Sequence, residues 1–160
     1  MAEQKTNVMR LLDQKKTTYR AHSYPHGDTA VDGLTVAGLI GKAPESVFKT
    51  LVARGASKNI LVFVIPVCCE LDLKRAARAA GEKSVEMIHV SEINAITGYV
   101  RGGCSPLGMK KQYKTILDSS CLSLESIVVS AGRIGSQVEL SPQDLIRLTH
   151  AATGDITKEP

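Results

Sequence analysis

A chain of 160 residues is long enough for one domain with its own hydrophobic core, so it needs no disulfide bonds for stability. Its hydrophobic fraction of 43% and charged fraction of 22% are ordinary for a soluble globular protein, and its longest apolar run, Ile60 to Val67, is too short to span a membrane. The 20 basic residues outnumber the 16 acidic ones, which favours polyanionic partners without identifying a nucleic-acid binder, and an aromatic content of 4% argues against stacking on single-stranded bases.

The N-terminal sequence carries scattered charges and no apolar signal core, which predicts a cytoplasmic protein in reducing conditions. Its four cysteines are therefore expected to be free thiols, and none has the C-x-x-C spacing of common metal sites. The adjacent pair Cys68 and Cys69 is poorly placed for a shared metal site or an easy disulfide. Because the four histidines are also dispersed, the sequence predicts no metal and no cofactor.

Three elements are predicted at the start of the chain. Apolar residues at helical spacing within 8–12, after Thr6 or Asn7 as a cap, predict a first helix. The alternating segment 17–24 predicts a strand, and residues 29–41 predict a short amphipathic helix that ends at a glycine.

A hairpin and a helix are predicted next. The β-rich runs 46–53 and 60–66 are joined by a six-residue loop that contains a glycine, which favours antiparallel pairing. Asp72 is the expected cap of a helix that continues through Ala80 and stops at Gly81.

The second half of the chain is expected to contain more strand than helix. Ser91 opens a short helix that ends near Gly98, and residues 98–108 form the most conspicuous loop, with four glycines and one proline. Ser141 caps a last helix that starts with a proline, and the tail after Gly154 is expected to be loosely ordered. Strands are predicted at about 113–117, 126–130 and 136–140.

These elements predict one mixed α/β domain over residues 1–160, with both ends loosely ordered. There is no internal repeat and no linker that would divide the chain. The hairpins argue against a doubly wound sheet, in which helices separate successive parallel strands, and closed or nearly closed sheets are expected instead.

The sequence lacks the standard catalytic motifs. There is no G-x-S-x-G, no P-loop, no G-x-G-x-x-G and no H-E-x-x-H. Without an evident nucleophile and base, a catalyst built on this chain has to rely on positioning, backbone hydrogen bonds and the reactive groups of the substrate itself.

Two places suit such a role. Lys49 lies among apolar residues of a predicted strand, where it is either a solvent-facing residue of an edge strand or a cation near a cleft that holds a phosphate or polarises a carbonyl. The loop 98–108 is either a structural turn or a rigid pocket rim, because its adjacent glycines allow close backbone approach and Pro106 stiffens it. Three basic residues that follow would attract phosphate: Lys110, Lys111 and Lys114.

Short motifs distributed along the chain carry a resemblance to a known family. They are HSYPH at 22–26, FKTL at 48–51, LKRAA at 73–77, TGY at 97–99, GGCSPLG at 102–108 and SPQDL at 141–145. Through them the chain resembles the YbaK family of bacterial aminoacyl-tRNA deacylases, which is related to the editing insertion of prolyl-tRNA synthetase. The resemblance implies a single-domain editing fold with a barrel-like mixed sheet flanked by helices, and a cleft for the aminoacylated 3′ end of tRNA.

The resemblance also implies roles for individual residues. Lys49 matches the essential lysine, which anchors the phosphate of the terminal adenosine or the substrate carbonyl, and Gly102 matches a glycine whose main chain contacts the substrate. Thr50 favours cysteine over alanine, because alanine-specific relatives commonly have asparagine after the lysine. Cys104 replaces an aliphatic residue and is interpreted as a small hydrophobe rather than a nucleophile. The substrate-binding positions are Tyr24, Thr50, Gly103, Ser105, Pro106 and Ser130.

The expected function is trans-editing, the hydrolysis of mischarged Cys-tRNA(Pro) by a deacylase. A proline pocket cannot strongly reject cysteine of similar size, so a second site has to remove the error. The cysteinyl ester carries its own thiol, whose pKa of about 8.5 allows cleavage without a protein base. Two alternatives stay open: an Ala-tRNA(Pro) deacylase, and a nonenzymatic module that binds tRNA or a synthetase. Prolyl-tRNA synthetase is an expected partner, and a membrane is not.

Overall fold

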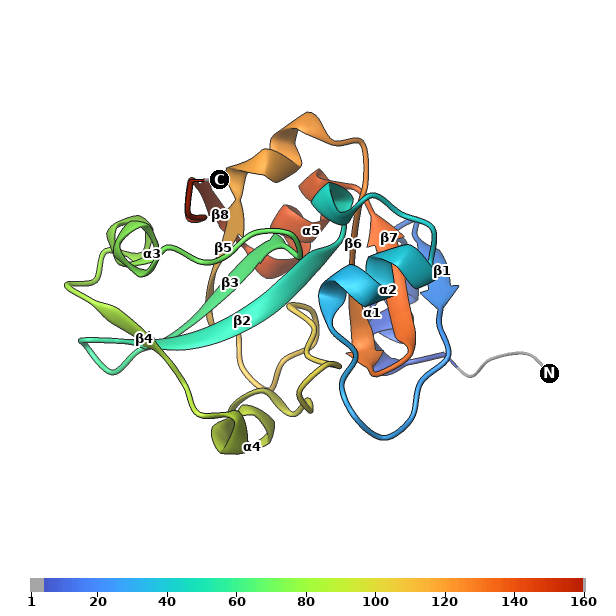
Figure 1. Ribbon diagram of the computed structural model, residues 1–160, viewed down its shortest axis with the longest axis horizontal. Coiled ribbons are helices and arrows are strands. Elements are labelled where there is room, and N and C mark those ends of the chain that lie inside the picture. Colours follow the sequence, from blue (N-terminus) through green and yellow to red (C-terminus); the bar gives the residue numbers. More distant parts are fainter. Residues whose placement is uncertain (1–4, 160) are drawn as a thin grey trace.

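The computed structural model describes residues 5–159, and the expected loose order of residues 1–4 and 160 lies outside them. Helices surround two β-sheets, with three short 3-10 helices in the connections (Figure 1). In chain order the elements are α1 Asn7–Gln14, β1 Arg20–Ser23, α2 Gly33–Leu39, η1 Pro44–Ser46, β2 Phe48–Gly55, β3 Ile60–Pro66, α3 Leu73–Ala80, β4 Val85–Met87, η2 Val90–Glu92, α4 Ile93–Thr97, β5 Lys114–Asp118, η3 Ser119–Ser123, β6 Ile127–Arg133, β7 Ser136–Leu140, α5 Pro142–Thr149 and β8 Ala152–Gly154.

The sheets are mixed, as the sequence predicts. One sheet has the strand order β1-β7-β6 and the other β4-β2-β3-β5-β8. The predicted hairpin is confirmed, since β2 and β3 pair antiparallel, whereas β3 with β5 and β5 with β8 pair parallel. The sheets touch at a parallel bridge between Val47 and Val128, and within residues 5–159 they do not close into a barrel. The three-residue strands β4 and β8 are too short to show an alternating pattern, so the sequence did not reveal them.

The longer helices begin at the predicted caps. Thr6 Oγ1 accepts a hydrogen bond from the N–H of Met9 in α1, and the Asp72 and Ser141 side chains cap α3 and α5 in the same way. The second helix begins later than predicted, because its cap is Asp32, whose carboxylate accepts from the N–H of Thr35 at 3.0 Å. No helix within residues 5–159 is long and apolar enough to cross a membrane.

The apolar run of β3 is explained by burial on both faces of this strand. Val62 and Val64 belong to a core cluster that also contains residues of α1, β6 and β7. Leu61 and Phe63 point to the opposite face and belong to a second cluster, which contains the alanines of α3. A strand that is covered on both sides needs no polar alternation, so β3 forms the centre of the molecule.

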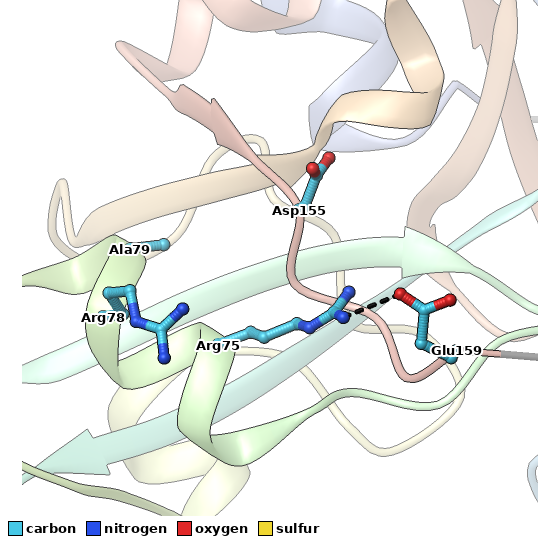
Figure 2. Close-up of a pocket in the computed structure, with 5 residues that line it drawn as sticks. All are labelled: Arg75, Arg78, Ala79, Asp155 and Glu159. Atoms are coloured by element: carbon cyan, nitrogen blue, oxygen red, sulfur yellow. Dashed lines mark hydrogen bonds and ion pairs between the residues drawn. The ribbon is translucent and has the colours of Figure 1, made fainter.

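The C-terminal segment is docked, so the expectation of a loose tail is wrong for residues 155–159. Ile156 is fully buried, its N–H donates to Asp118 Oδ1 at 3.2 Å, and its carbonyl accepts from the N–H of Asp72 at 2.8 Å. Figure 2 shows Arg75 of α3 reaching Glu159, with 2.8 Å between guanidinium and carboxylate. A buried isoleucine, together with hydrogen bonds and an ion pair to residues distant in sequence, therefore anchors a segment with no periodic pattern.

Glu139 of β7 joins β1 to two connecting segments of the chain. Its carboxylate lies 2.8 Å from His22 Nε2 of β1 and 3.0 Å from Lys42 Nζ, and it also accepts from the Ser126 hydroxyl. Burial favours the neutral acid, but the hydrogen bonds from Ser126, His22 and Lys42 outweigh it and lower the Glu139 pKa to about 2. The ionised carboxylate is therefore part of the folded structure.

We expect Glu139→Gln to lower the free energy of unfolding by about 2 kcal/mol at neutral pH, because three hydrogen-bonding partners lose a charged acceptor. A folded-state pKa of about 2 against an ordinary 4.5 means that the wild-type stabilisation is complete above about pH 4.5 and is lost as the pH falls towards 2. Denaturant unfolding at several pH values tests this. The variant should have a flatter pH profile in this window, and an unchanged profile would contradict the role of Glu139.

Candidate active site

A cleft of about 860 Å³ opens where β2 and β6 separate. The two strands run parallel at the Val47–Val128 bridge, and Lys49 and Ser130 follow two residues later, where no further pairing holds the strands together. Residues of segments 28–33 and 100–104 form the other walls. The cleft is therefore a consequence of the incomplete closure between the two sheets.

The structure brings most of the predicted site residues together. The residues that line the cleft are Tyr24, Lys49, Thr50, Gly102 and Ser130. Gly103, Ser105 and Pro106 do not line it, although they belong to the same loop. The N–H of Gly103 donates to Val100 O at 3.0 Å, and Ser105 Oγ accepts from the N–H of Leu107 at 3.2 Å, so these groups fold the loop. That these three residues contact substrate stays a prediction.

Lys49 supplies a cation to the cleft wall. Its side chain is half-buried, and it forms no ion pair with a carboxylate within residues 5–159. Arg101 adds a second positive charge at the exposed rim. An unpaired ammonium in a cleft favours an anionic or strongly polar ligand, such as a phosphate or an ester carbonyl.

Two hydroxyl groups of the cleft lack hydrogen-bond partners in the described part of the chain. Tyr24 OH and Thr50 Oγ1 are both buried and unpaired. A buried polar group without a partner costs about 1–3 kcal/mol, so an arrangement of this kind favours a bound ligand or water that satisfies it. Ser136 Oγ is also unpaired, but it does not line the cleft.

Tyr24 is held in place through the backbone. Its N–H donates to Gly135 O at 3.0 Å, which ties it to the β6–β7 turn. His22, two residues earlier, is fixed by Glu139, and the ring of His26 lies edge-on to Tyr24 with 6.4 Å between centroids. The phenol therefore has a defined direction without a hydrogen bond of its own.

Gly102 is required by the close approach of two walls. Its φ is +86°, a left-handed conformation that side chains disfavour, and an added Cβ would lie 2.6 Å from Ala30 Cβ. In the part of the chain that the structure describes, the Gly102 N–H makes no hydrogen bond, so it remains available to a ligand. Loop 98–108 can thus present main chain to the cleft only with glycine at this position.

We expect Gly102→Ala to lower stability by about 1–3 kcal/mol and to reduce activity at the cleft, because left-handed strain and the contact with Ala30 push the loop outwards. Gly38→Ala is the matched control. Gly38 lies in α2, and a Cβ added there meets nothing within 4 Å. That control should keep its activity, and its free energy of unfolding should increase by up to about 1 kcal/mol, because alanine favours a helix more than glycine does. Thermal melting and a steady-state assay compare them, and a Gly102→Ala protein with both properties intact would contradict the steric argument.

Cys104 lines the cleft but is a poor nucleophile. Burial raises its pKa to about 11, and a hydrogen bond with Thr97 opposes this only in part. The thiol is therefore protonated at neutral pH, whereas nucleophilic cysteines depend on the thiolate.

Gln137 is a cleft residue that sequence reasoning missed. Its side chain is 6% exposed, and its amide makes no hydrogen bond within residues 5–159. It lies opposite Ser130 in the β6–β7 register, so the two polar side chains occupy neighbouring positions. Pairing the predicted strands 126–130 and 136–140 as a hairpin would have revealed this position.

Another charged hollow lies away from this cleft. It measures about 420 Å³ and lies between α3 and the C-terminal segment, where Figure 2 shows Arg75, Arg78, Asp155 and Glu159. None of the predicted site residues lines it. Among residues 5–159, no group of three or more His, Cys, Asp or Glu side chains is arranged to hold a metal ion.

Comparisons with known proteins agree on one family. Residues 25–148 match the model of the aminoacyl-tRNA editing domain. EbsC of Enterococcus faecalis, a protein named for Cys-tRNA(Pro)/Cys-tRNA(Cys) deacylase activity, is 43% identical over 155 residues, which cover 97% of this chain and 94% of the relative.

Solved structures of low sequence identity share the fold. A structure described as a trans-editing enzyme for prolyl-tRNA synthetase has a TM-score of 0.82 at 20% identity, with 98% of this chain and 100% of that chain covered. The hypothetical protein APE2540 has a TM-score of 0.86 at 23% identity, with 96% and 100% covered. The mixed α/β fold is therefore shared by proteins whose sequences have diverged widely.

Proposed function

Because the chain belongs to the family of aminoacyl-tRNA editing domains, we propose that it removes cysteine from mischarged Cys-tRNA(Pro) by cleaving the aminoacyl ester. The observation that carries this proposal is the cleft itself, in which an unpaired Lys49 ammonium lies with two unpaired hydroxyl groups. A cation and hydroxyl groups are suitable partners for the ester carbonyl and terminal phosphate of an aminoacylated tRNA end.

Each cleft residue has a proposed role. Lys49 holds the terminal phosphate or polarises the ester carbonyl, and the Gly102 N–H donates to the same carbonyl oxygen as negative charge develops there. Tyr24 OH and Thr50 Oγ1 satisfy their hydrogen bonds on the substrate, which fixes its orientation. Ser130 lies opposite the lysine, beyond the bridge between the strands. Binding thus supplies the hydrogen bonds that these two hydroxyl groups do not make within residues 5–159.

The proposed reaction uses the sulfur of the substrate. The cysteinyl thiolate attacks its own ester carbonyl carbon, a sulfur–carbon bond forms, and the bond from that carbon to the ribose oxygen breaks. The ribose oxygen takes up a proton, and the four-membered thiolactone that leaves is hydrolysed by water to free cysteine. Because the unperturbed pKa of the substrate thiol is about 8.5, part of it is ionised at neutral pH, and no protein base is needed. The protein contributes orientation and carbonyl stabilisation.

Selectivity then depends on chemistry more than on pocket size. An alanyl ester of similar volume enters the same cleft but carries no nucleophile, so it is a poor substrate. This supports cysteine over the alternative of an Ala-tRNA(Pro) deacylase, since the lysine is followed by Thr50 and the Cys104 thiol of the cleft is protonated. Discrimination between tRNA bodies is proposed to come from prolyl-tRNA synthetase as a partner.

The proposal is tested with Cys-tRNA(Pro), Ala-tRNA(Pro) and Cys-tRNA(Cys), each in large excess over the protein. We expect repeated turnover of both cysteinyl esters and little loss of the alanyl ester, with added prolyl-tRNA synthetase favouring Cys-tRNA(Pro). A nonenzymatic binding module would instead leave the ester intact or protect a stoichiometric amount of it, which would overturn the proposal.

A further inference from the structure

Cys68 and Cys69 follow β3 in a tight turn beside the cleft. The N–H of Cys69 donates to Pro66 O at 3.0 Å, which closes a four-residue turn, and Val67 within this turn lines the cleft. Consecutive side chains of an extended strand point to opposite faces, but the turn brings these two together. Their Sγ atoms are 3.9 Å apart, with Cys68 exposed and Cys69 half-buried. The turn therefore brings close together two thiols that the sequence predicted to be poorly placed for a shared metal site.

We propose that Cys68 and Cys69 form a chelating dithiol site for one soft, thiolate-binding divalent cation, of which Zn²⁺ and Cd²⁺ are examples. Thiolate ligands select soft and borderline cations over Mg²⁺ or Ca²⁺. Two metal–sulfur bonds of about 2.3 Å that span the observed 3.9 Å enclose an angle of about 116°. This angle is close to that of tetrahedral coordination, so the pair fits such a cation with little rearrangement.

The site supplies two protein ligands and leaves the other positions to water. Asp118, whose charge acts on Cys69, is already engaged, because it accepts hydrogen bonds from the N–H groups of Ser120 at 3.3 Å and Ile156 at 3.2 Å. Residues 5–159 contain no third ligand of the usual types at this point. We therefore expect reversible, exchangeable binding at the surface rather than a permanent structural metal.

Cation binding here releases protons. The positive charge of Lys49 acts on the Cys69 thiol. Since a metal-bound thiol is deprotonated, affinity should increase with pH. The same electrostatic contact with Lys49 indicates that a bound cation adds positive charge at the edge of the cleft.

The test uses fully reduced, metal-free protein, with Cd²⁺ as the probe and the ultraviolet thiolate-to-cadmium absorption as the signal. We expect one Cd²⁺ per chain, and Cys68→Ser or Cys69→Ser should each weaken binding by roughly 10²-fold, because loss of one sulfur removes the chelate effect. Cys104→Ser is the matched control and should bind as the wild type does. The readout is independent of the proposed deacylation, so either proposal can fail alone.

Three results would overturn the site. One is a wild-type protein without the cadmium absorption, and another is full binding by Cys68→Ser. The third is binding of a trivalent phenylarsenical with no binding of Cd²⁺, since this would indicate a geometry other than tetrahedral. Because Cys68 is exposed, its serine variant is expected to fold, and a melting curve verifies this.

Discussion

Lys49→Ala is expected to reduce kcat/KM on Cys-tRNA(Pro) by about 10²- to 10³-fold, because it removes the cleft cation that we propose binds the ester or its phosphate. The side chain has no carboxylate partner within residues 5–159, so its loss breaks no ion pair of the fold. The effect should therefore appear in catalysis rather than in stability. Deacylation kinetics and thermal melting of the same preparations separate the two.

Two further variants make this prediction specific. Lys49→Met keeps the apolar stem and removes only the charge, so it should be nearly as impaired as Lys49→Ala. Lys83→Ala removes the same formal charge from the exposed connection between α3 and β4 and should remain active. Full activity of Lys49→Met would contradict the electrostatic role, and equal losses for Lys49 and Lys83 variants would indicate only a weaker general attraction for RNA.

Ser-tRNA(Pro) is expected to be cleaved about 10³-fold more slowly than Cys-tRNA(Pro), although serine differs only by oxygen in place of sulfur. The seryl hydroxyl is un-ionised at neutral pH, so the substrate loses its internal nucleophile while the binding contacts stay the same. Single-turnover rates at saturating protein measure the chemical step and exclude a difference in binding.

Cys104→Ala is the control for this interpretation. The Cys104 pKa of about 11 means that its thiolate is scarce at neutral pH, so the variant should retain the wild-type rate. The rate on Cys-tRNA(Pro) should rise with pH as the substrate thiol, with a pKa of about 8.5, ionises. If Cys104→Ala folds but is inactive, the protein thiol is the nucleophile. If seryl and cysteinyl esters react equally fast, water or a ribose hydroxyl attacks.

Local signals in the sequence predicted most helices and strands. Thr6, Asp72 and Ser141 each cap the helix that follows, because a side-chain oxygen before an apolar pattern is a purely local device. The docking of Ile156 was not predicted. It depends on the N–H of Asp72 as donor and the carboxylate of Asp118 as acceptor, and both residues are distant in sequence. Short segments that pair only through tertiary contacts carry no periodic pattern to detect.

The candidate site was predictable only in part for the same reason. Lys49 and Gly102 stand out by residue type, and both line the cleft. Which side of the glycine loop faces the cleft depends on how the loop folds. The N–H of Gly103 donates to Val100 O within the loop and does not face the cleft. Gln137 required knowledge of the strand register. The cleft itself arises from the separation of β2 and β6, which no sequence window contains.

We propose that this chain cleaves a cysteinyl ester on tRNA. The decisive measurement is the rate of ester loss from Cys-tRNA(Pro) and Ala-tRNA(Pro), followed side by side with a small amount of protein. We expect many turnovers on the cysteinyl ester and a rate near the uncatalysed background on the alanyl ester. Faster loss of the alanyl ester, or no acceleration of either, would contradict the account.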